Sequence, residues 1–154
     1  MQPRLKYRDS SPEGFAAILQ LNTYVESCGI ENSLLELVKA RASQINGCAY
    51  CLDMHTKDAR AAGETEQRLY TLSAWRETPF FSTRERAALA WTEAVTRISE
   101  YHIDDELYAE LRQHFSEKEA VDLTLAVIVI NGWNRLAIPF QSEVGSYQTN
   151  SATK

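Results

Sequence analysis

The sequence predicts an all-α protein, for three reasons. Apolar residues recur at helical spacing along most of the chain, signals for helix starts and stops separate these stretches, and no segment shows a convincing strand pattern. No repeat, linker or composition shift divides the 154 residues. We therefore expect a single domain of six to seven helices over residues 1–154, with a flexible C-terminal tail over about 145–154.

Two helices are predicted in the first third of the chain. Ser11-Pro12 is a helix start, apolar residues follow at helical spacing, and Gly29 ends the segment. The pattern Ser-Leu-Leu-Glu at 33–36 indicates a capping box, in which a serine and a glutamate satisfy free N–H groups at a helix start. The helix that it opens ends at Asn46-Gly47.

The next two helices flank a glycine. One runs from about Cys48 to Ala62, and Gly63 is its C-terminal stop. The other covers roughly 65–76 and ends before Pro79, because the residue before a proline avoids the helical region.

The second half of the chain adds three helices. Ser-Thr-Arg-Glu at 82–85 and Ser-Glu-Lys-Glu at 116–119 are capping boxes, and Asp104 caps a shorter helix through Phe115. The last helix is apolar over 120–130, well short of the ~20 residues that a membrane span needs. We interpret it as a buried core or interface helix.

The candidate site lies at the start of the helix over 48–62. Residues at i, i+3 and i+7 share one face of a helix, so Cys48, Cys51 and His55 form a single stripe. A domain of this length can bury a core without disulfide or metal staples. Stability therefore does not require the two cysteines.

These residue types suit thiol chemistry. Cys48 is expected in the first helical turn, where free N–H groups and the helix dipole lower a thiol pKa. A thiolate can attack a peroxide or a disulfide, and a second thiol can close the intramolecular disulfide that releases the product. His55 can then serve as general acid or base near neutral pH. This chemistry needs no cofactor and no metal.

Glu36 is the candidate for orienting His55. In one continuous helix, Glu36 and Cys48 would be ~18 Å apart, too far for contact. If the helix after Asn46-Gly47 folds back along the helix before it, Glu36 comes level with His55, and a relay from Glu36 through His55 to Cys51 becomes possible. The alternative is that Glu36 only closes the capping box of its own helix.

The run ELVKARASQINGCAYCLDMH at 36–55 resembles the core motif of the carboxymuconolactone decarboxylase-like superfamily, in its alkylhydroperoxidase D branch. The stretches STRERAALAW at 82–91 and NGWNR at 131–135 resemble later segments of that branch, so the likeness covers roughly residues 30–140. A glutamate, a C-x-x-C pair and a histidine at these intervals are more specific than the C-x-x-C pair alone.

The resemblance implies a helical bundle with the redox motif at a helix N-terminus, peroxidase or disulfide-reductase activity, and assembly into trimers or hexamers. It also implies that Cys51 is activated through Glu36 and His55. The more exposed Cys48 would then exchange with a thiol reductant or a peroxiredoxin-type partner. The substrate would be a peroxide or a disulfide.

One position departs from the family's pattern. Tyr50 stands where the best-known members have a histidine, and a tyrosine does not carry protons near neutral pH in the same way. The sequence therefore indicates disulfide exchange more strongly than peroxide turnover. The decarboxylases proper lack the cysteine pair, which argues against lactone decarboxylation here.

Two other classes of function stay open. Cys48, Cys51 and His55, with Glu36 or a water, could bind zinc, although structural zinc usually takes ligands from two separate segments. The same side chains could instead be packed core residues of a redox-inert helical assembly module.

Composition limits the partners. The net charge of -5 argues against a nucleic-acid surface, and no secretory signal or membrane span can be read. The cytosol is then the expected compartment, where a C-x-x-C pair is catalytic or metal-binding more often than a structural bridge.

The remaining candidates are read as structural. Cys28 and Trp91 are expected to pack, His102 and His114 to lie at the surface, and the stretch 131–135 to serve packing or an interface. Because the last helix is apolar on almost every face, we expect a homotrimer or a homohexamer, with Trp133 near an interface.

Overall fold

The computed structural model describes residues 2–149. These residues form eight α-helices and one 3-10 helix, and they contain no strand. The helices are α1 Tyr7–Ser10, α2 Pro12–Ser27, α3 Asn32–Asn46, α4 Ala49–Ala61, α5 Glu66–Thr71, η1 Leu72–Glu77, α6 Thr83–Thr96, α7 Asp105–His114 and α8 Glu117–Phe140. The all-α prediction is confirmed. The number of helices exceeds the predicted six to seven because α1 spans only four residues, too few for a periodic signal.

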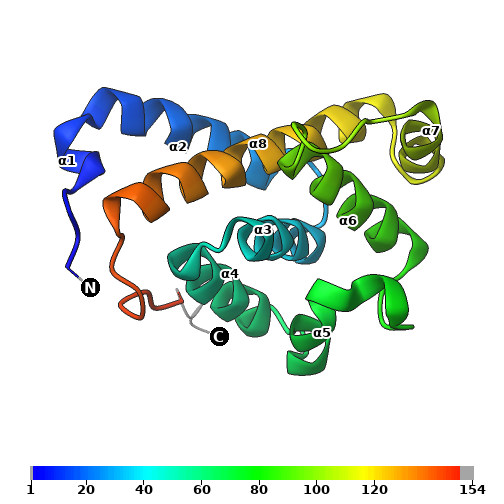
Figure 1. Ribbon diagram of the computed structural model, residues 1–154, viewed down its shortest axis with the longest axis horizontal. Helices are drawn as coiled ribbons and strands as arrows, with labels where there is room; N and C mark the ends of the chain where they lie inside the picture. Colours follow the sequence, from blue (N-terminus) through cyan, green and yellow to red (C-terminus); the bar gives the residue numbers. More distant parts are fainter. Residues whose placement is uncertain (1, 150–154) are drawn as a thin grey trace.

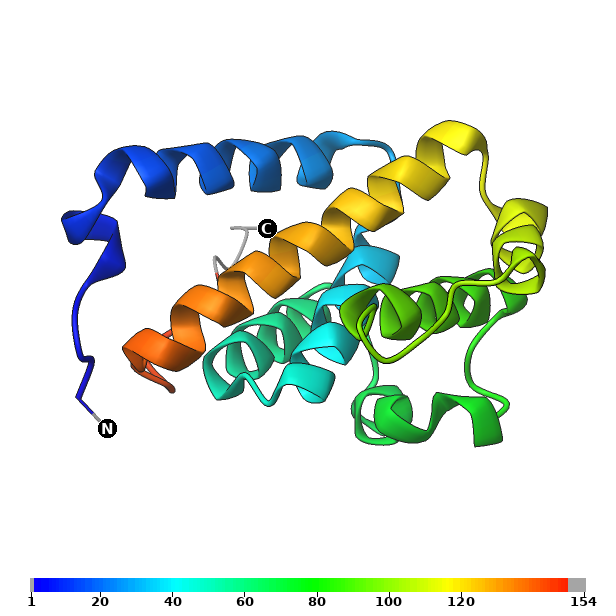
Figure 2. The same cartoon turned by 45° about the horizontal axis from the view of Figure 1, so that its top comes forward.

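Helix α3 lies at the centre of the molecule (Figure 1) and contacts α4, α6 and α8. Its residues from Leu34 to Ala40 are all buried, including the charged Glu36 and Lys39. Figure 2 shows α8 (yellow to orange) running diagonally across the molecule, with α2 (blue) beside it, and α8 contacts α2, α3, α4 and α6. The fold thus encloses a charged segment of α3 among the neighbouring α-helices α4, α6 and α8.

Two of the three predicted capping boxes are present. Ser82 and Glu85 cap α6, and Ser116 and Glu119 cap α8, each with both reciprocal hydrogen bonds. The box predicted at 33–36 is wrong. Helix α3 begins earlier, at Asn32, and the residue at its N-cap, Glu31, makes no side-chain cap hydrogen bond.

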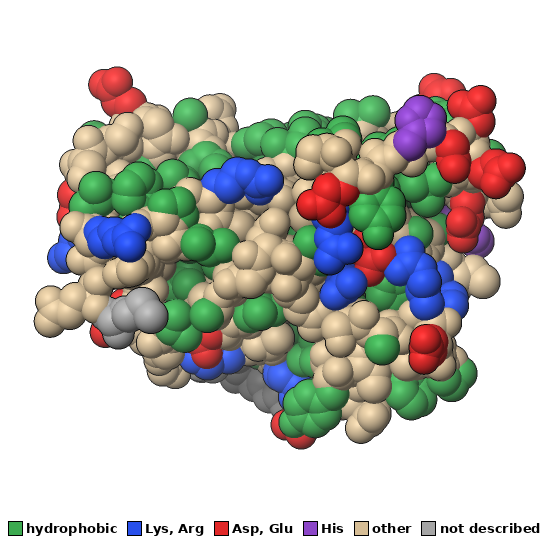
Figure 3. All heavy atoms as spheres, viewed as in Figure 1, with side chains coloured by type: hydrophobic (Ala, Val, Ile, Leu, Met, Phe, Trp, Pro, Cys, Tyr) green, Lys and Arg blue, Asp and Glu red, His purple; other side chains and the backbone are tan. Residues whose placement is uncertain are grey.

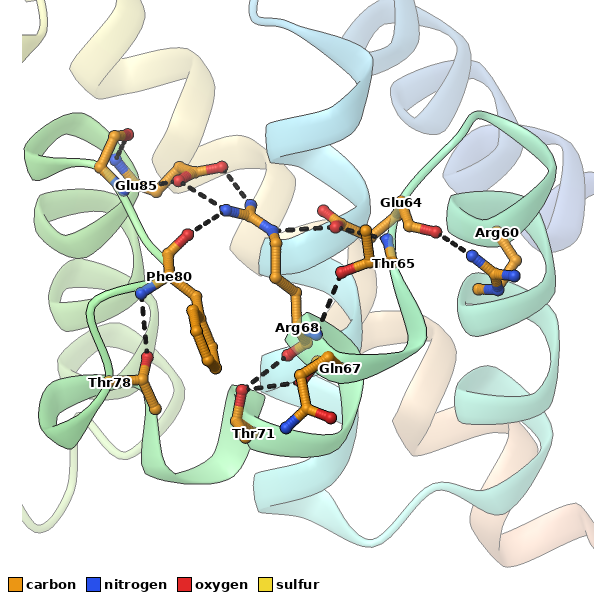
Figure 4. Close-up of polar contacts among 10 residues, drawn as sticks. Arg60, Glu64, Thr65, Gln67, Arg68, Thr71, Thr78, Phe80 and Glu85 are labelled. Atoms are coloured by element: carbon orange, nitrogen blue, oxygen red, sulfur yellow. Dashed lines mark hydrogen bonds and ion pairs between the residues drawn. The ribbon is translucent and has the colours of Figure 1, made fainter.

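Arg68 ties α5 to α6 at the other end of the molecule. Its guanidinium donates to Glu64 (Nε to Oε1, 2.8 Å), to the carbonyl of Phe80 and to Glu85 (Nη2 to Oε1, 2.5 Å), as Figure 4 shows. Glu85 therefore closes its capping box and pairs with Arg68 at the same time. The helix predicted over 65–76 is accordingly a short α5 followed by the 3-10 turn η1.

Helix α8 is a core helix of 24 residues, longer than the apolar run noted in the sequence. By length and composition it is the one helix within residues 2–149 that could cross a membrane. In the fold, 44% of its apolar stretch is buried inside the molecule, and a core helix of a soluble protein meets the same criterion.

Beyond α8 the chain turns back toward α4 (Figure 1). The N–H of Gly145 donates to Asp53 Oδ2 (3.2 Å), the Tyr147 hydroxyl donates to Asp58 Oδ1 (2.7 Å), and Lys57 Nζ donates to the carbonyl of Tyr147 (3.0 Å). This part of the predicted tail therefore contacts α4. Residues 150–154 lie outside the described residues.

Candidate active site

The turn between α3 and α4 places the cysteine pair. Gly47 has a positive φ of 69°, which glycine adopts without the penalty of a Cβ, and it reverses the chain so that α4 runs back along α3. Cys48 has an extended backbone and is the N-cap of α4, which begins at Ala49, one residue after the predicted start at about Cys48. Its Sγ accepts the backbone N–H of Cys51 at 3.4 Å.

The two thiols are within hydrogen-bond distance, with Sγ atoms 2.8 Å apart. When Cys48 is ionised, the Cys51 thiol is its donor; this contact lowers the pKa of Cys48 to about 7, against the effect of burial. The backbone N–H groups at the helix start act in the same direction. The same contact and burial raise the pKa of Cys51, so the first proton leaves from Cys48.

The structure brings Glu36 and His55 together. Glu36 Oε2 lies 2.8 Å from His55 Nδ1, across the packed faces of α3 and α4. Its other oxygen accepts from Lys39 Nζ at 3.0 Å, so neither oxygen caps α3. The three side chains are at most 8% exposed. Glu36 is therefore a buried partner of His55, and the cap-only alternative is wrong.

The charge on Glu36 sets the tautomer of His55. Burial acts to raise the pKa of Glu36, but His55 and Lys39 outweigh it and hold that pKa below its ordinary value. An ionised carboxylate only accepts, so the His55 proton sits on Nδ1. The opposite nitrogen, Nε2, is buried and has no hydrogen-bond partner within the described part of the chain. It is free to take a proton.

A cavity of about 290 Å³ opens onto Glu36, Cys51 and His55. Its remaining walls are mostly aromatic or apolar and come from α1, α2, α4, α8 and the C-terminal segment, with Tyr7, Phe15, Leu19, Tyr50, Met54, Trp133 and Tyr147 among them. Such a lining suits a small, largely apolar molecule that needs a few polar contacts at one end.

A second cavity, of about 510 Å³, reaches Cys48 from another side. Residues 47–50 form one wall, and the end of α8 with residues 141–144 forms the other. The resemblance implied that Cys48 is more exposed than Cys51. That expectation is wrong for this chain, because each residue is only 1% exposed. Instead, the two cysteines line different cavities: Cys51 lines the cavity at His55, and Cys48 lines the second cavity.

Tyr50 lies half-buried in the wall of both cavities. Burial raises its pKa above the ordinary value for tyrosine, so it keeps its proton near neutral pH. It can donate a hydrogen bond, but it cannot act as the base that a histidine at this position would supply.

A possible metal-ligand group is present, but it differs from the predicted one. Ligand atoms of Glu36, His55 and Asp58 lie within 4.8 Å of one another, whereas neither cysteine sulfur belongs to a ligand group among residues 2–149. The Lys39 ammonium on Glu36 reduces the negative charge that would attract a cation. The arrangement therefore gives little support to a zinc site built on the cysteines.

Sequence reasoning missed several residues of this site. Lys39 binds Glu36, and Asp58 and Tyr147 line the cavity around His55. Asp58 could have been found, because it follows His55 by three residues on the same helix face. Tyr147 could not, because its position depends on how the chain returns after α8.

The other residues singled out in the sequence have structural surroundings. Cys28 is half-buried at the end of α2, and His102 is exposed. Trp91 is buried, and its indole donates to Thr124 Oγ1 at 2.9 Å. Trp133 is half-buried, donates to Asn22 Oδ1 at 3.1 Å and lines the cavity at Cys51.

The sequence also matches known proteins. The pattern of the carboxymuconolactone decarboxylase family matches residues 12–94. The uncharacterised protein YdfG of Bacillus subtilis (strain 168) is 44% identical over 146 residues, which cover 95% of this chain and 99% of YdfG.

Two solved structures show the same fold. ATU0492 of Agrobacterium tumefaciens, a protein of unknown function for which a role as antioxidant defence protein AhpD has been suggested, superposes with a TM-score of 0.91. It is 44% identical, and the match covers 95% of this chain and 100% of that one. An uncharacterised peroxidase-related protein from Silicibacter sp. TM1040 has a TM-score of 0.76 at 23% identity, over 85% and 70% of the two chains.

The Silicibacter protein, at 23% identity, shows the fold alone. The match to the family pattern spans more than half of the 154 residues, and YdfG matches nearly end to end. On this evidence the chain belongs to the carboxymuconolactone decarboxylase family, with the all-α fold of its AhpD-like members.

Proposed function

We propose that this protein is a thiol-disulfide oxidoreductase of the alkylhydroperoxidase type, which cycles between a dithiol and a Cys48–Cys51 disulfide and reduces peroxides or disulfides. The observation that carries the proposal is the buried Glu36–His55 contact of 2.8 Å beside two thiols whose sulfurs are 2.8 Å apart. A packing role alone does not explain a buried imidazole whose Nε2 has no partner among the described residues.

The oxidative half of the cycle starts in the cavity that contains Cys51 and His55. His55 Nε2 takes the Cys51 proton, directly or through a water, and Glu36 stabilises the resulting imidazolium. The Cys51 sulfur then bonds to one peroxide oxygen as the O–O bond breaks, and the departing oxygen takes the proton from His55. The products are an alcohol, or water, and a sulfenic acid on Cys51.

Cys48 resolves this intermediate. Its sulfur adjoins that of Cys51, and the backbone N–H groups at the start of α4 and the Asn134 amide act to lower its pKa. The thiolate attacks the Cys51 sulfur, the S–O bond breaks, and hydroxide leaves as water after gaining a proton. A disulfide substrate would need the same two sulfurs, with a thiol as the leaving group in place of the oxygen.

A dithiol reductant must close the cycle, and the second cavity supports its entry at Cys48. One reductant thiolate bonds to Cys48, Cys51 leaves as a thiolate, and the second reductant thiol releases Cys48 by forming its own disulfide. We place this exchange in the cytosol, where such dithiols are kept reduced.

A thiol count tests the proposal most directly. Mild peroxide treatment should remove two of the three thiols, and peptide mapping should find a Cys48–Cys51 bridge with Cys28 still free. The Cys51→Ser variant should lose no thiol pair and should lack turnover, whereas Cys28→Ser, which changes a residue outside the site, should behave as the wild type. A bridge to Cys28, or no bridge, would contradict the proposal.

We also propose assembly into a trimer or hexamer through the α2–α8 side. Figure 3 shows hydrophobic side chains (green) at the surface where these helices run. On α8, Val121, Ile128 and Ile138 are 59%, 49% and 44% exposed, so this helix leaves large apolar side chains that a neighbouring subunit could bury. A monomer mass by light scattering at micromolar concentration would refute the assembly and leave the redox proposal intact.

A further inference from the structure

A fully buried asparagine lies on the α8 side of the cysteine pair. Asn134 belongs to the stretch 131–135 that the sequence assigned to packing or an interface, and it is 1% exposed. It lies on one face of α8 with Ile130, four residues before it, and Ala137, three residues after it. Both of those residues pack in one cluster with Cys48 and Cys51. Asn134 therefore faces the thiols from α8.

Hydrogen bonds fix the orientation of its amide. Asn46 Nδ2 donates to Asn134 Oδ1 at 2.8 Å, so the oxygen is turned toward the end of α3. Asn134 Nδ2 donates one of its two N–H groups to Ser43 Oγ at 3.1 Å. The second N–H group of Nδ2 makes no other hydrogen bond among residues 2–149, and it is the group that we assign to the sulfurs. Because Asn46 precedes Gly47-Cys48 directly, the contact also ties the turn that carries the first cysteine to α8.

The supporting network extends one turn along α8. Asn46 Nδ2 donates as well to Asn131 Oδ1 at 2.9 Å, and Asn131 Nδ2 donates to Thr96 Oγ1 at 3.1 Å. Buried amides are costly unless their polar atoms are satisfied, and a fully bonded set holds each member in one orientation. If position 134 served packing alone, a leucine would fill a similar space and would not need hydrogen-bond partners.

We propose that Asn134 stabilises the thiolates of this site, as an uncharged N–H donor to whichever sulfur carries the negative charge, with Asn46 and Ser43 as its positioning residues. This inference rests on the proposed function and adds a residue to it. A negative charge lies on Cys48 when the pair has lost one proton to solvent; it lies on Cys51 when His55 takes the Cys51 proton while Cys48 is protonated, and again when Cys51 leaves the disulfide.

Electrostatics agree with this role. The Asn134 amide acts to lower the pKa of both thiols, although the contact between the two sulfurs is the larger influence on each. A neutral donor suits a site whose charge moves between two atoms, because it helps either thiolate without locking the charge on one of them. A lysine at the same place would hold a permanent charge in a buried position.

The test measures the pH at which Cys48 ionises, in a Cys28→Ser background that leaves only the pair. The rate of alkylation by iodoacetamide and the ultraviolet absorbance of the thiolate should both titrate with a midpoint of about 7 in the parent. Asn134→Leu should move that midpoint upward by about one pH unit, since a hydrogen bond to a charged group contributes about that much. Asn134→Asp should move it upward further, because a carboxylate repels the thiolate.

Asn131→Leu is the matched control. It removes an amide of the same network one turn away that has no contact with the sulfurs, so it should lower stability to thermal unfolding and should move the midpoint far less than Asn134→Leu does. A midpoint unchanged in folded Asn134→Leu and Asn134→Asp would overturn the inference. If Asn134→Leu does not fold, the nearly isosteric Asn134→Asp decides alone.

This readout does not depend on peroxide turnover. Failure of the proposed function would appear as a parent protein without turnover, whereas failure of the present inference would appear as variants whose thiolate midpoint matches that of the parent.

Discussion

Glu36 and Glu85 share a sequence pattern and have different surroundings. Each is the fourth residue of a Ser-x-x-Glu stretch that predicts a capping box. Glu85 accepts the N–H of Ser82 at 2.7 Å and pairs with Arg68, so its bonds hold α5, α6 and the loop between them in place (Figure 4). Glu36 lies two residues further into its helix, is buried, and pairs with Lys39 and His55.

The difference lies at the far end of each network. Arg68 is the charged partner of Glu85, and its guanidinium also donates to Glu64 and to the carbonyl of Phe80. The partner of Glu36 is His55, whose Nε2 is unbonded within residues 2–149 and lies in a cavity wall beside Cys51. A closed network stabilises structure, whereas one that ends in a free base beside a thiol is suited to proton transfer.

The largest expected effect is at Glu36. Glu36→Gln should lower peroxide or disulfide turnover by about 10²-fold, because His55 loses the partner that fixes its tautomer and stabilises its imidazolium. Steady-state rates per folded molecule measure this. The variant should also lose about 1–3 kcal/mol of stability, because the buried Lys39 ammonium loses its carboxylate.

A double variant separates these two losses. Adding Lys39→Met to Glu36→Gln removes the unpaired buried charge and should recover stability, but it should not restore turnover. Turnover that recovers together with stability would show that Glu36 serves only the fold.

The matching change at the other glutamate should affect stability alone. Glu85→Ala removes half of a capping box and the pair with the partly buried Arg68, which should cost about 1–2 kcal/mol in urea unfolding. Turnover per folded molecule should stay at the wild-type value. A fall in turnover beyond the folded fraction would break the contrast between the two sites.

Much of the fold could be predicted because its signals are local. The boxes at Ser82 and Ser116 and the stop at Gly47 depend on neighbours within a few residues, and the fold-back at Gly47 led to the Glu36–His55 pairing. The start of α3 was predicted at a capping box over 33–36, but the helix begins at Asn32. The Ser-x-x-Glu pattern there looks the same as the two real boxes, and only the contacts of Glu36 with Lys39 and His55 distinguish it.

Contacts between distant segments explain what the sequence did not predict. Tyr147 reaches Asp58 only because the chain returns along α4 after α8, and Asn134 meets Asn46 only because α8 crosses the end of α3. The exposure of Cys48 was mispredicted for the same reason, since residues of α8 and the segment beyond it form the opposite wall of its cavity.

Acid should weaken both networks. Burial alone would raise the carboxyl pKa of Glu36 and of Glu85, but their hydrogen bonds and ion pairs lower both pKa values in the folded state. As pH falls below the ordinary carboxyl value of ~4.3, the unfolded chain therefore binds more protons than the folded protein. The stability that these two carboxylates contribute is present above that pH and is lost as pH falls through their folded-state pKa values. Urea midpoints across a pH series should fall less steeply on the acid side in Glu36→Gln/Lys39→Met and in Glu85→Ala than in the wild type.

The smallest expected effect concerns the two serines that begin these patterns. Ser82 accepts the N–H of Glu85 at 3.3 Å as the N-cap of α6, so Ser82→Ala should cost about 1 kcal/mol. Ser33 is exposed, lies inside α3 rather than at its cap, and Glu36 does not reach back to it. Ser33→Ala should therefore change the unfolding free energy by less than about 0.5 kcal/mol, because alanine is the better helix former and no cap is lost. Paired urea unfolding curves resolve the two cases. A loss at Ser33 as large as that at Ser82 would mean that α3 does begin with a capping box in solution, and Glu36 would then be shared between capping its helix and orienting His55.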